Sequence, residues 1–215
     1  EGWSGMSAQH AVSRSVRDSA ALLDLTHGAD LGAPYAAQPP VRPFLAEVGA
    51  KPGRLRIALQ TTTWNATPTH PSCVAAAEDT AKLCASLGHQ VEEARFDLQL
   101  EPFREATATI IGASTRATME ERARALGRPL VPEDVEPGTW LVASGGAARD
   151  AVAYVRALRT LHRLGRELAR FLERYDVLLT PTLAVPPVPL GVLSLSNPNP
   201  GESLGTLFQT IGFSQ

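Results

Sequence analysis

The spacing of apolar residues predicts a strand–helix–strand unit in the first half of the chain. Leu55–Gln60 is an apolar, β-branched run after a Pro-Gly turn, and His89–Phe96 is a second strand. Between them a helix begins at Pro71 and ends before Gly88. Six residues are predicted to form its inner face: Cys73, Ala76, Ala77, Thr80, Cys84 and Leu87. A strand, a helix and a strand in such a short span favour parallel pairing of the two strands.

Helical patterns dominate the rest of the chain. Ser15 is expected to begin a helix in the manner of a capping box, with Asp18 three residues later, and Gly28 ends it. The first 13 residues are expected to be loop, and residues 29–53 an irregular connection with one helical turn at 44–48. Further elements are predicted in four stretches: helices over 102–126 and 148–174, a short buried strand over 176–180, and a last helix capped by Ser203.

The predicted class is α/β. The Pro-rich run over 181–189 must be extended, because each proline excludes helix for itself and its predecessor. Glu78 and Lys82 are spaced for an ion pair on the outer side of the first long helix.

Composition is that of an ordinary soluble globular protein, with 44% apolar and 20% charged residues among 215. The net charge of −2 gives no reason to expect nucleic acid or an anionic membrane as a partner. The chain has no apolar run of about 18 residues, and its first residues lack the charged region and apolar stretch that a signal peptide has. Two cysteines are too few for a disulfide scaffold, so we expect a cytoplasmic protein.

Ser203 lies in a Gly201-Glu-Ser-Leu-Gly205 sequence that matches the G-x-S-x-G nucleophile elbow. An elbow needs a strand before the serine and triad partners after it. Pro198 and Pro200 interrupt any strand, and the ten following residues contain neither His nor Asp. We therefore interpret Ser203 as a helix cap.

His70, Cys73, Cys84 and His89 have spacings that resemble the two halves of a zinc site. The cysteines are eleven residues apart on one helix, a rise of roughly 16 Å at 1.5 Å per residue. Two thiolates on one zinc ion must each lie about 2.3 Å from it. We therefore expect no metal site and no disulfide, and interpret both cysteines as buried core thiols.

Other polar groups also have ordinary structural interpretations. Ser144-Gly145-Gly146 lacks the strand and lysine of a phosphate loop, so we predict a loop or helix start. Lys82 points to the polar side of its helix and Lys51 lies in a turn, so neither suits catalysis. A basic stripe is interpreted as a solvated helix face rather than a docking surface: Arg149, Arg156, Arg159, Arg163, Arg166, Arg170 and Arg174.

Three stretches, which together span nearly the whole chain, are informative in their order: Ala11–Asp24, the strand–helix–strand stretch with Leu55–Ala58, His70-Pro71 and Leu83–Glu93, and Tyr175–Thr182 followed by Pro186–Gly191. In this order they resemble the amidase signature family, and in particular the bacterial amidases that include 6-aminohexanoate-cyclic-dimer hydrolase. The resemblance implies part of the amidase-signature fold, a mixed central sheet covered by helices, with residues 1–215 forming a partial amidase domain.

The resemblance also implies hydrolysis of a carboxamide by a Lys–Ser–Ser triad, without metal or cofactor. The backbone N–H groups of a loop of the form Gly-Gly-Ser-apolar-Arg would hold the oxyanion, and this loop is absent from the sequence. No catalytic, cofactor-binding or metal residue is therefore carried onto the chain. The start without Met and the end inside an apolar segment lead us to expect a fragment downstream of the triad, inactive alone.

The transferable contributions are structural. Arg17 and Asp18 are candidates for anchoring the loop after the catalytic core, or simply begin a helix. Thr180-Pro181-Thr182 is a candidate border of the acyl pocket, or simply ends a strand, and residues 103–118 are expected to shape specificity. The expected partner is a small amide substrate, with a homodimer of the full-length protein. Two alternatives stay open: a glutaminase subunit of a tRNA-dependent amidotransferase, and a non-catalytic α/β interaction module that uses the arginine stripe.

Overall fold

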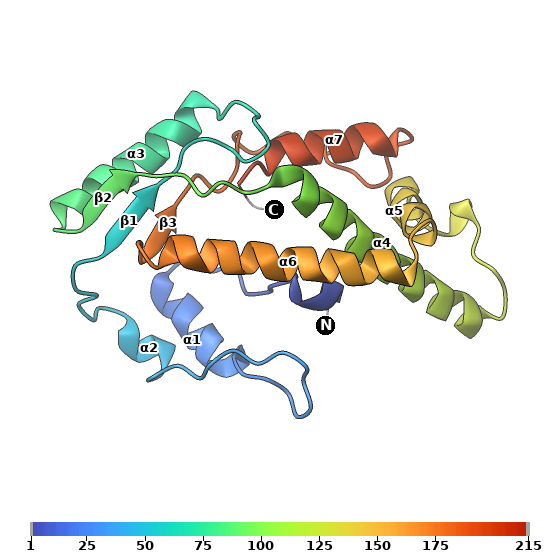
Figure 1. Ribbon diagram of the computed structural model, residues 1–215, viewed down its shortest axis with the longest axis horizontal. Helices are drawn as coiled ribbons and strands as arrows, with labels where there is room; N and C mark the ends of the chain where they lie inside the picture. Colours follow the sequence, from blue (N-terminus) through green and yellow to red (C-terminus); the bar gives the residue numbers. More distant parts are fainter. Residues whose placement is uncertain (1, 214–215) are drawn as a thin grey trace. The chain divides into compact units, whose positions relative to one another are not determined.

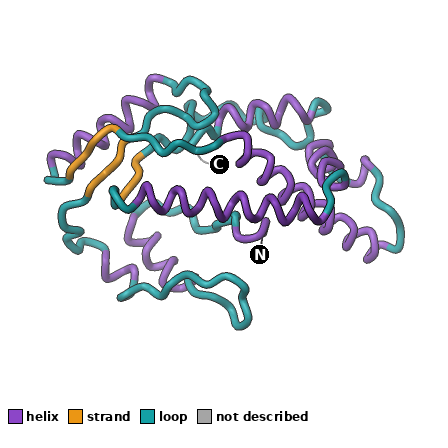
Figure 2. The backbone as a smooth tube through the Cα atoms, in the orientation of Figure 1, coloured by secondary structure: helices purple, strands orange, loops and turns teal. Residues whose placement is uncertain are grey.

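The computed structural model describes residues 2–213, which fall into two compact units that divide between Gly53 and Arg54. Figure 1 traces the elements along the chain, and Figure 2 distinguishes helices, strands and loops. The class is α/β, as the sequence predicts. No helix within residues 2–213 has the length and apolar character needed to cross a membrane.

The first unit contains η1 (Gly2–Gly5), α1 (Val16–Thr26) and α2 (Phe44–Glu47). The Ser15 hydroxyl accepts a hydrogen bond from the Asp18 N–H at 3.0 Å, which confirms the predicted start of α1. The η1 turn corrects the expectation of loop throughout the first 13 residues. The Asp24 carboxylate accepts from the N–H groups of Phe44 (2.6 Å) and Leu45 (2.9 Å), so α1 supplies the cap of α2.

The second unit contains a three-stranded sheet of order β2-β1-β3, with β1 at Arg56–Leu59, β2 at Gln90–Glu93 and β3 at Val177–Leu179. Both pairings are parallel, and the strand–helix–strand pattern predicts the pairing of β1 with β2. Ile57 pairs with Val91 on one side and Val177 on the other. The central strand carries the core, since Ile57 and Ala58 are buried. β3 was expected to be buried, but Val177 is exposed because β3 lies at the sheet's edge.

The helix between the first two strands, α3 (Pro71–Ser86), begins at Pro71 as predicted and packs on β1 and β2. Fewer of its residues are buried than the six predicted for its inner face. Within α3 only Ala77 and Ala81 are buried, since their small side chains, one turn apart, let the helix approach the sheet closely. Thr80 and Leu87 are exposed, and the two cysteines are half-buried free thiols instead of fully buried ones.

On the outer surface of α3, one ion pair differs from the predicted one. Lys82 Nζ lies 3.0 Å from Asp79 and not in the predicted ion pair with Glu78. Both carboxylates raise the pKa of Lys82, and the hydrogen bond that Lys82 donates to Asp79 is the main cause.

The remaining helices are α4 (Leu100–Leu126), η2 (Pro132–Asp134), α5 (Pro137–Ala147), α6 (Ala151–Leu172) and α7 (Pro200–Thr210). α4 packs against both α5 and α6 (Figure 1), and α5 also contacts α7. Gly127 ends α4 in the left-handed conformation, and the Asp150 carboxylate caps α6 through the Ala153 N–H. The Pro-rich stretch that precedes α7 contains no helix, as predicted.

Ser144-Gly145-Gly146 is neither a loop nor a helix start, but lies inside α5. The reason is a close helix crossing. A Cβ added at Gly112 of α4 would lie 2.9 Å from the Gly146 Cα, so the two backbones touch where neither residue has a side chain. The contact between helices decides the conformation here, over the weak helix propensity of glycine.

Ser203 does not cap the last helix. Pro200 occupies the first helical position, so Asn199 is the cap residue and Ser203 falls within α7. Its side chain is buried, and its hydroxyl has no hydrogen-bond partner within residues 2–213.

Candidate functional site

The three parallel strands end at one edge of the sheet, where three loops emerge. They comprise residues 60–70 after β1, 94–99 after β2 and 180–185 after β3. In open parallel sheets, ligands bind outside the carboxyl ends of the strands. This edge is therefore the place to look for a site in the second unit.

Gln60, directly after β1, joins the first two loops. Its side chain is 2% exposed, and its Oε1 accepts from the Phe96 N–H at 3.0 Å while its Nε2 donates to the Thr62 carbonyl at 2.9 Å. Its backbone N–H also donates to the Leu179 carbonyl, which ties the third strand to the same point. A buried amide with both ends satisfied fixes the spacing of the loops.

The loop over 60–70 is held by its own hydroxyl groups. Thr63 Oγ1 donates to the Thr67 carbonyl and Thr69 Oγ1 donates to the Thr61 carbonyl, each at 2.6 Å. Ala66 adopts the left-handed conformation with φ of 59°, which is unfavourable for a residue with a Cβ. Such a conformation persists only where surrounding bonds impose it.

The end of the described chain packs against this loop. The Trp64 backbone N–H donates to the Gly212 carbonyl at 3.2 Å, and Asn65 Nδ2 donates to the Phe208 carbonyl. Gly212 approaches so closely that an added Cβ would lie 2.6 Å from Thr63 Cγ2. The loop is therefore fixed from both sides.

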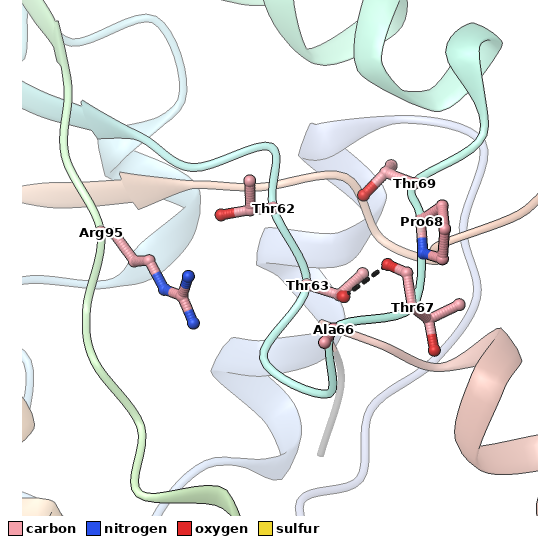
Figure 3. Close-up of a pocket in the computed structure, with 7 residues that line it drawn as sticks. All are labelled: Thr62, Thr63, Ala66, Thr67, Pro68, Thr69 and Arg95. Carbon is pink, nitrogen blue, oxygen red and sulfur yellow. Dashed lines mark hydrogen bonds between the residues drawn. The ribbon is translucent and has the colours of Figure 1, made fainter.

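A pocket of about 290 Å³ opens beside this loop (Figure 3). Its lining comes from the loop after β1 and from one residue after β2: Thr62, Thr63, Ala66, Thr67, Pro68, Thr69 and Arg95. The Arg95 guanidinium faces the loop, and the Thr62 hydroxyl points toward the same space (Figure 3). The lining combines one cation, hydroxyl groups, an alanine and a proline, so it suits a small ligand with one anionic end and an aliphatic body.

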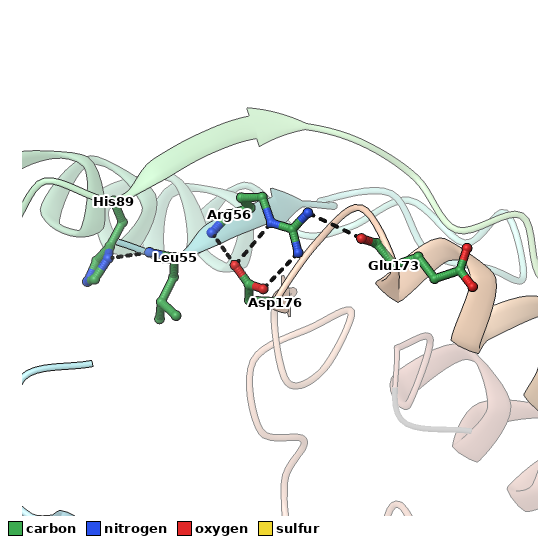
Figure 4. A network of polar contacts seen from close by, with 5 residues as sticks. All are labelled: Leu55, Arg56, His89, Glu173 and Asp176. Atoms are coloured by element: carbon green, nitrogen blue, oxygen red, sulfur yellow. Dashed lines mark hydrogen bonds and ion pairs between the residues drawn. The ribbon is translucent and has the colours of Figure 1, made fainter. Parts of the chain in front are cut away.

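The opposite edge of the sheet carries an ion pair (Figure 4). Arg56 donates to both oxygens of the Asp176 carboxylate, at 2.9 Å and 3.2 Å, and to the Glu173 carbonyl. The side-chain hydrogen bond from Arg56 lowers the pKa of Asp176 to about 2. Beside it, His89 Nδ1 accepts from the Leu55 N–H. This edge joins the starts of the strands.

The structure separates the residues that resembled a zinc site. The His89 ring is engaged with Leu55, and the His70 ring is within hydrogen-bond distance of the Ser72 hydroxyl. Within residues 2–213, no group of three or more His, Cys, Asp or Glu is placed to hold a metal ion.

The serine and lysine candidates also lack catalytic surroundings. Ser144 Oγ donates to the Trp140 carbonyl of its own helix, and Ser203 is buried inside α7. Lys82 is exposed and paired with Asp79. None of these residues meets another in a nucleophile–base arrangement.

Arg17 and Asp18 lie in the first turn of α1, both exposed, with 3.8 Å between the guanidinium and the carboxylate. Thr180-Pro181-Thr182 lies at the carboxyl edge of the sheet, where Pro181 is buried, but these residues do not line the pocket in Figure 3.

The arginine stripe is partly engaged within the chain. Arg163 bonds Glu167 at 2.8 Å and Gln99 at 3.0 Å, Arg149 lies 3.8 Å from Glu105, and Arg174 covers the Tyr175 ring. The remaining four arginines are exposed on one side of α6, as a solvated face predicts: Arg156, Arg159, Arg166 and Arg170.

Comparison with known proteins decides the family. The family model described as Amidase matches residues 4–206. The chain belongs to the amidase family. A relative from Synechocystis sp. named "Putative amidase" is 34% identical over 192 residues, which cover 87% of this chain and 34% of that protein. The 6-aminohexanoate-cyclic-dimer hydrolase of Paenarthrobacter ureafaciens is 29% identical and matches 89% of this chain and 40% of its own length.

Solved amidase structures agree with this assignment. A 6-aminohexanoate cyclic dimer hydrolase in complex with substrate superposes with a TM-score of 0.81 and 29% identity, covering 94% of this chain and 44% of that one. A bacterial aryl acylamidase of the amidase signature family shares the fold, with a TM-score of 0.71 over 82% of this chain and 36% of that one, at 22% identity. The chain thus spans about a third to under half of the length of these relatives.

The pocket of this amidase chain was not predicted, although the sequence contains a signal for it. Five threonines lie within nine residues, Thr61–Thr69, directly after a predicted strand. A polar run at the carboxyl end of a parallel strand is a typical ligand position. The position of Arg95 had no comparable signal, because the second loop is held alongside the first by bonds between residues far apart in sequence, from the Phe96 N–H to Gln60 and from the Trp64 indole N–H to the Phe96 carbonyl.

Proposed function

We propose that the complete protein hydrolyses the C–N bond of a carboxamide. The observation that carries this proposal is the match to a 6-aminohexanoate cyclic dimer hydrolase over 94% of the chain at a TM-score of 0.81, together with the Amidase family match. On the same basis, we propose an aliphatic amide as substrate, of the class to which a 6-aminohexanoate dimer belongs.

We propose that a Lys–Ser–Ser triad outside this chain performs the reaction. One serine would attack the carbonyl. A second serine would relay the proton of the attacking serine to a neutral lysine, and backbone N–H groups would stabilise the oxyanion. The surroundings of Ser144, Ser203 and Lys82 support this proposal, because each is occupied or buried as described above. The contribution of this chain would be scaffold and part of the substrate environment, including the Thr180-Pro181-Thr182 border.

The proposal is tested by comparing two proteins, this chain alone and the longer product of its gene. Both are incubated with 6-aminohexanoate cyclic dimer and a linear aliphatic amide, and released amine is measured. We expect activity only from the longer protein, and loss of it when the serine proposed as its nucleophile is replaced by alanine. Hydrolysis by this chain alone, or an unaffected serine variant, would contradict the proposal.

Two further properties are proposed with it. We expect the complete protein to be cytoplasmic and a homodimer, which fractionation and light scattering would test. Hydrolysis of glutamine that requires co-purifying subunits would instead indicate the amidotransferase alternative.

A further inference from the structure

We propose that the pocket beside Arg95 binds the carboxylate of a small aliphatic acid. The Arg95 guanidinium would pair with the carboxylate, the Thr62 hydroxyl would donate a hydrogen bond to it, and the aliphatic part would contact Ala66 and Pro68. This site needs only residues of this chain, so it can be tested without any hydrolytic activity.

The first observation is an available cation. Arg95 lines the pocket and makes no ion pair or hydrogen bond to another residue within the described part of the chain, although Glu93 and Asp97 lie close in sequence. Arg56 on β1, by contrast, is engaged with Asp176 and Glu173. A guanidinium presents parallel N–H groups that match the two oxygens of a carboxylate.

The second observation is that the pocket walls are fixed before any ligand arrives. Gln60 is buried and bonds both loops, and Thr63 Oγ1 closes the turn around Ala66. The left-handed conformation of Ala66 is maintained by these bonds at the pocket surface. A preformed wall lowers the entropic cost of binding, which matters most for small ligands.

The third observation concerns the class of anion. One guanidinium compensates one negative charge, so a monoanionic carboxylate fits better than a phosphate dianion. The methyl groups of the threonines, with Ala66 and Pro68, offer an apolar surface beside the cation. An acid of this kind is also what hydrolysis of an aliphatic amide releases, which would make the pocket a place for product or for a substrate with a free acid group.

The test titrates the folded chain with hexanoate, hexanamide and inorganic phosphate. Binding is measured by calorimetry and by NMR of the arginine side-chain N–H groups. We expect saturable binding of hexanoate with a Kd of about 1–10 mM. Hexanamide has nearly the same shape without the charge and should bind at least about tenfold more weakly. Equal binding of hexanamide would reduce the pocket to an apolar surface, and tighter binding of phosphate would make it a general anion site. Either result would overturn the proposal.

Two substitutions at exposed positions locate the site. Arg95→Gln should weaken hexanoate binding by about tenfold or more, and Thr62→Val by about threefold to tenfold. Arg122→Gln removes an exposed arginine of α4 and should leave binding unchanged. Because all three positions are exposed, the variants keep the fold, which circular dichroism checks. Binding that survives Arg95→Gln, or no saturable binding of hexanoate at all, would sink the proposal.

Discussion

Arg56 and Asp176 are 120 residues apart in sequence and are joined by four hydrogen bonds at the start of the sheet. The Arg56 N–H donates to the Asp176 carboxylate at 2.8 Å, and the Asp176 N–H donates to the Arg56 carbonyl at 2.8 Å. The guanidinium adds two hydrogen bonds to the same carboxylate. A single aspartate thus joins β3 to β1 before their ladder begins.

This pairing predicts a pH dependence of stability. Arg56 lowers the pKa of Asp176 from its ordinary value of 3.8 to about 2, so the charged carboxylate favours the folded state. The stabilisation is fully present above about pH 4–5 and is lost as the pH falls toward about 2. Urea unfolding of the native chain and Asp176→Asn should differ most at neutral pH and converge in acid. A constant difference from neutral pH down to pH 2 would contradict the assignment.

The close crossing of α4 and α5 predicts opposite effects at adjacent glycines. Gly146→Ala would force a Cβ against the Gly112 backbone and should lower the free energy of unfolding by about 1–3 kcal/mol. Gly145 has no atom within 4 Å of its added Cβ. Gly145→Ala should therefore raise the free energy of unfolding by about 0.5–1 kcal/mol through helix propensity. Denaturant titration of the two variants checks both signs, and equal effects would show that the helices do not touch there.

The left-handed conformation of Ala66 predicts that a glycine at this position stabilises the folded chain. With φ of 59°, its Cβ is strained, and Ala66→Gly removes that strain at the cost of a more flexible unfolded chain. The net expectation is a gain of up to about 1 kcal/mol in the free energy of unfolding. Ala85→Gly, on the exposed side of α3, should instead lose about 1 kcal/mol. Thermal unfolding of both variants tests the contrast. A loss at both positions would mean that Ala66 is not left-handed.

The cap that Asp24 supplies predicts a local effect in the first unit. Asp24→Ala removes both acceptors from the Phe44 and Leu45 N–H groups and should expose them to solvent. Loss of a helix cap costs about 0.5–2 kcal/mol, so hydrogen exchange at these two amides should accelerate several-fold or more. Asp18→Ala is the matched control, because the Ser15 cap uses the Asp18 N–H and not its carboxylate. Unchanged exchange at Phe44 in Asp24→Ala would refute the cap.

Local signals were enough to predict most of the elements. Ser15, Pro71 and the glycines after the helices act on their own neighbourhoods, so the sequence places these helices within a few residues. Gly146 and Ser203 were misjudged for different reasons. Gly146 depends on Gly112, 34 residues away, and Ser203 was displaced from the cap by a proline that itself begins the helix.

The site was harder to predict than the fold, because its parts meet only through long-range bonds. Gln60 reaches Phe96 across 36 residues, and Asn65 reaches Phe208 across 143. Neither partner carries a sequence mark of this role. The resemblance to amidases identified the family correctly, yet it named no residue of this pocket.

The contact of Trp64 with Gly212 has a consequence for synthesis on the ribosome. The loop that lines the pocket emerges roughly 150 residues before the segment that holds it. At about 5–20 residues per second, that interval lasts roughly 7–30 s. Throughout it the Trp64 ring lacks the Phe213 ring that it meets edge-on in the finished structure. The nascent chain therefore carries an unfinished pocket wall for many seconds, a stretch in which a chaperone has time to bind.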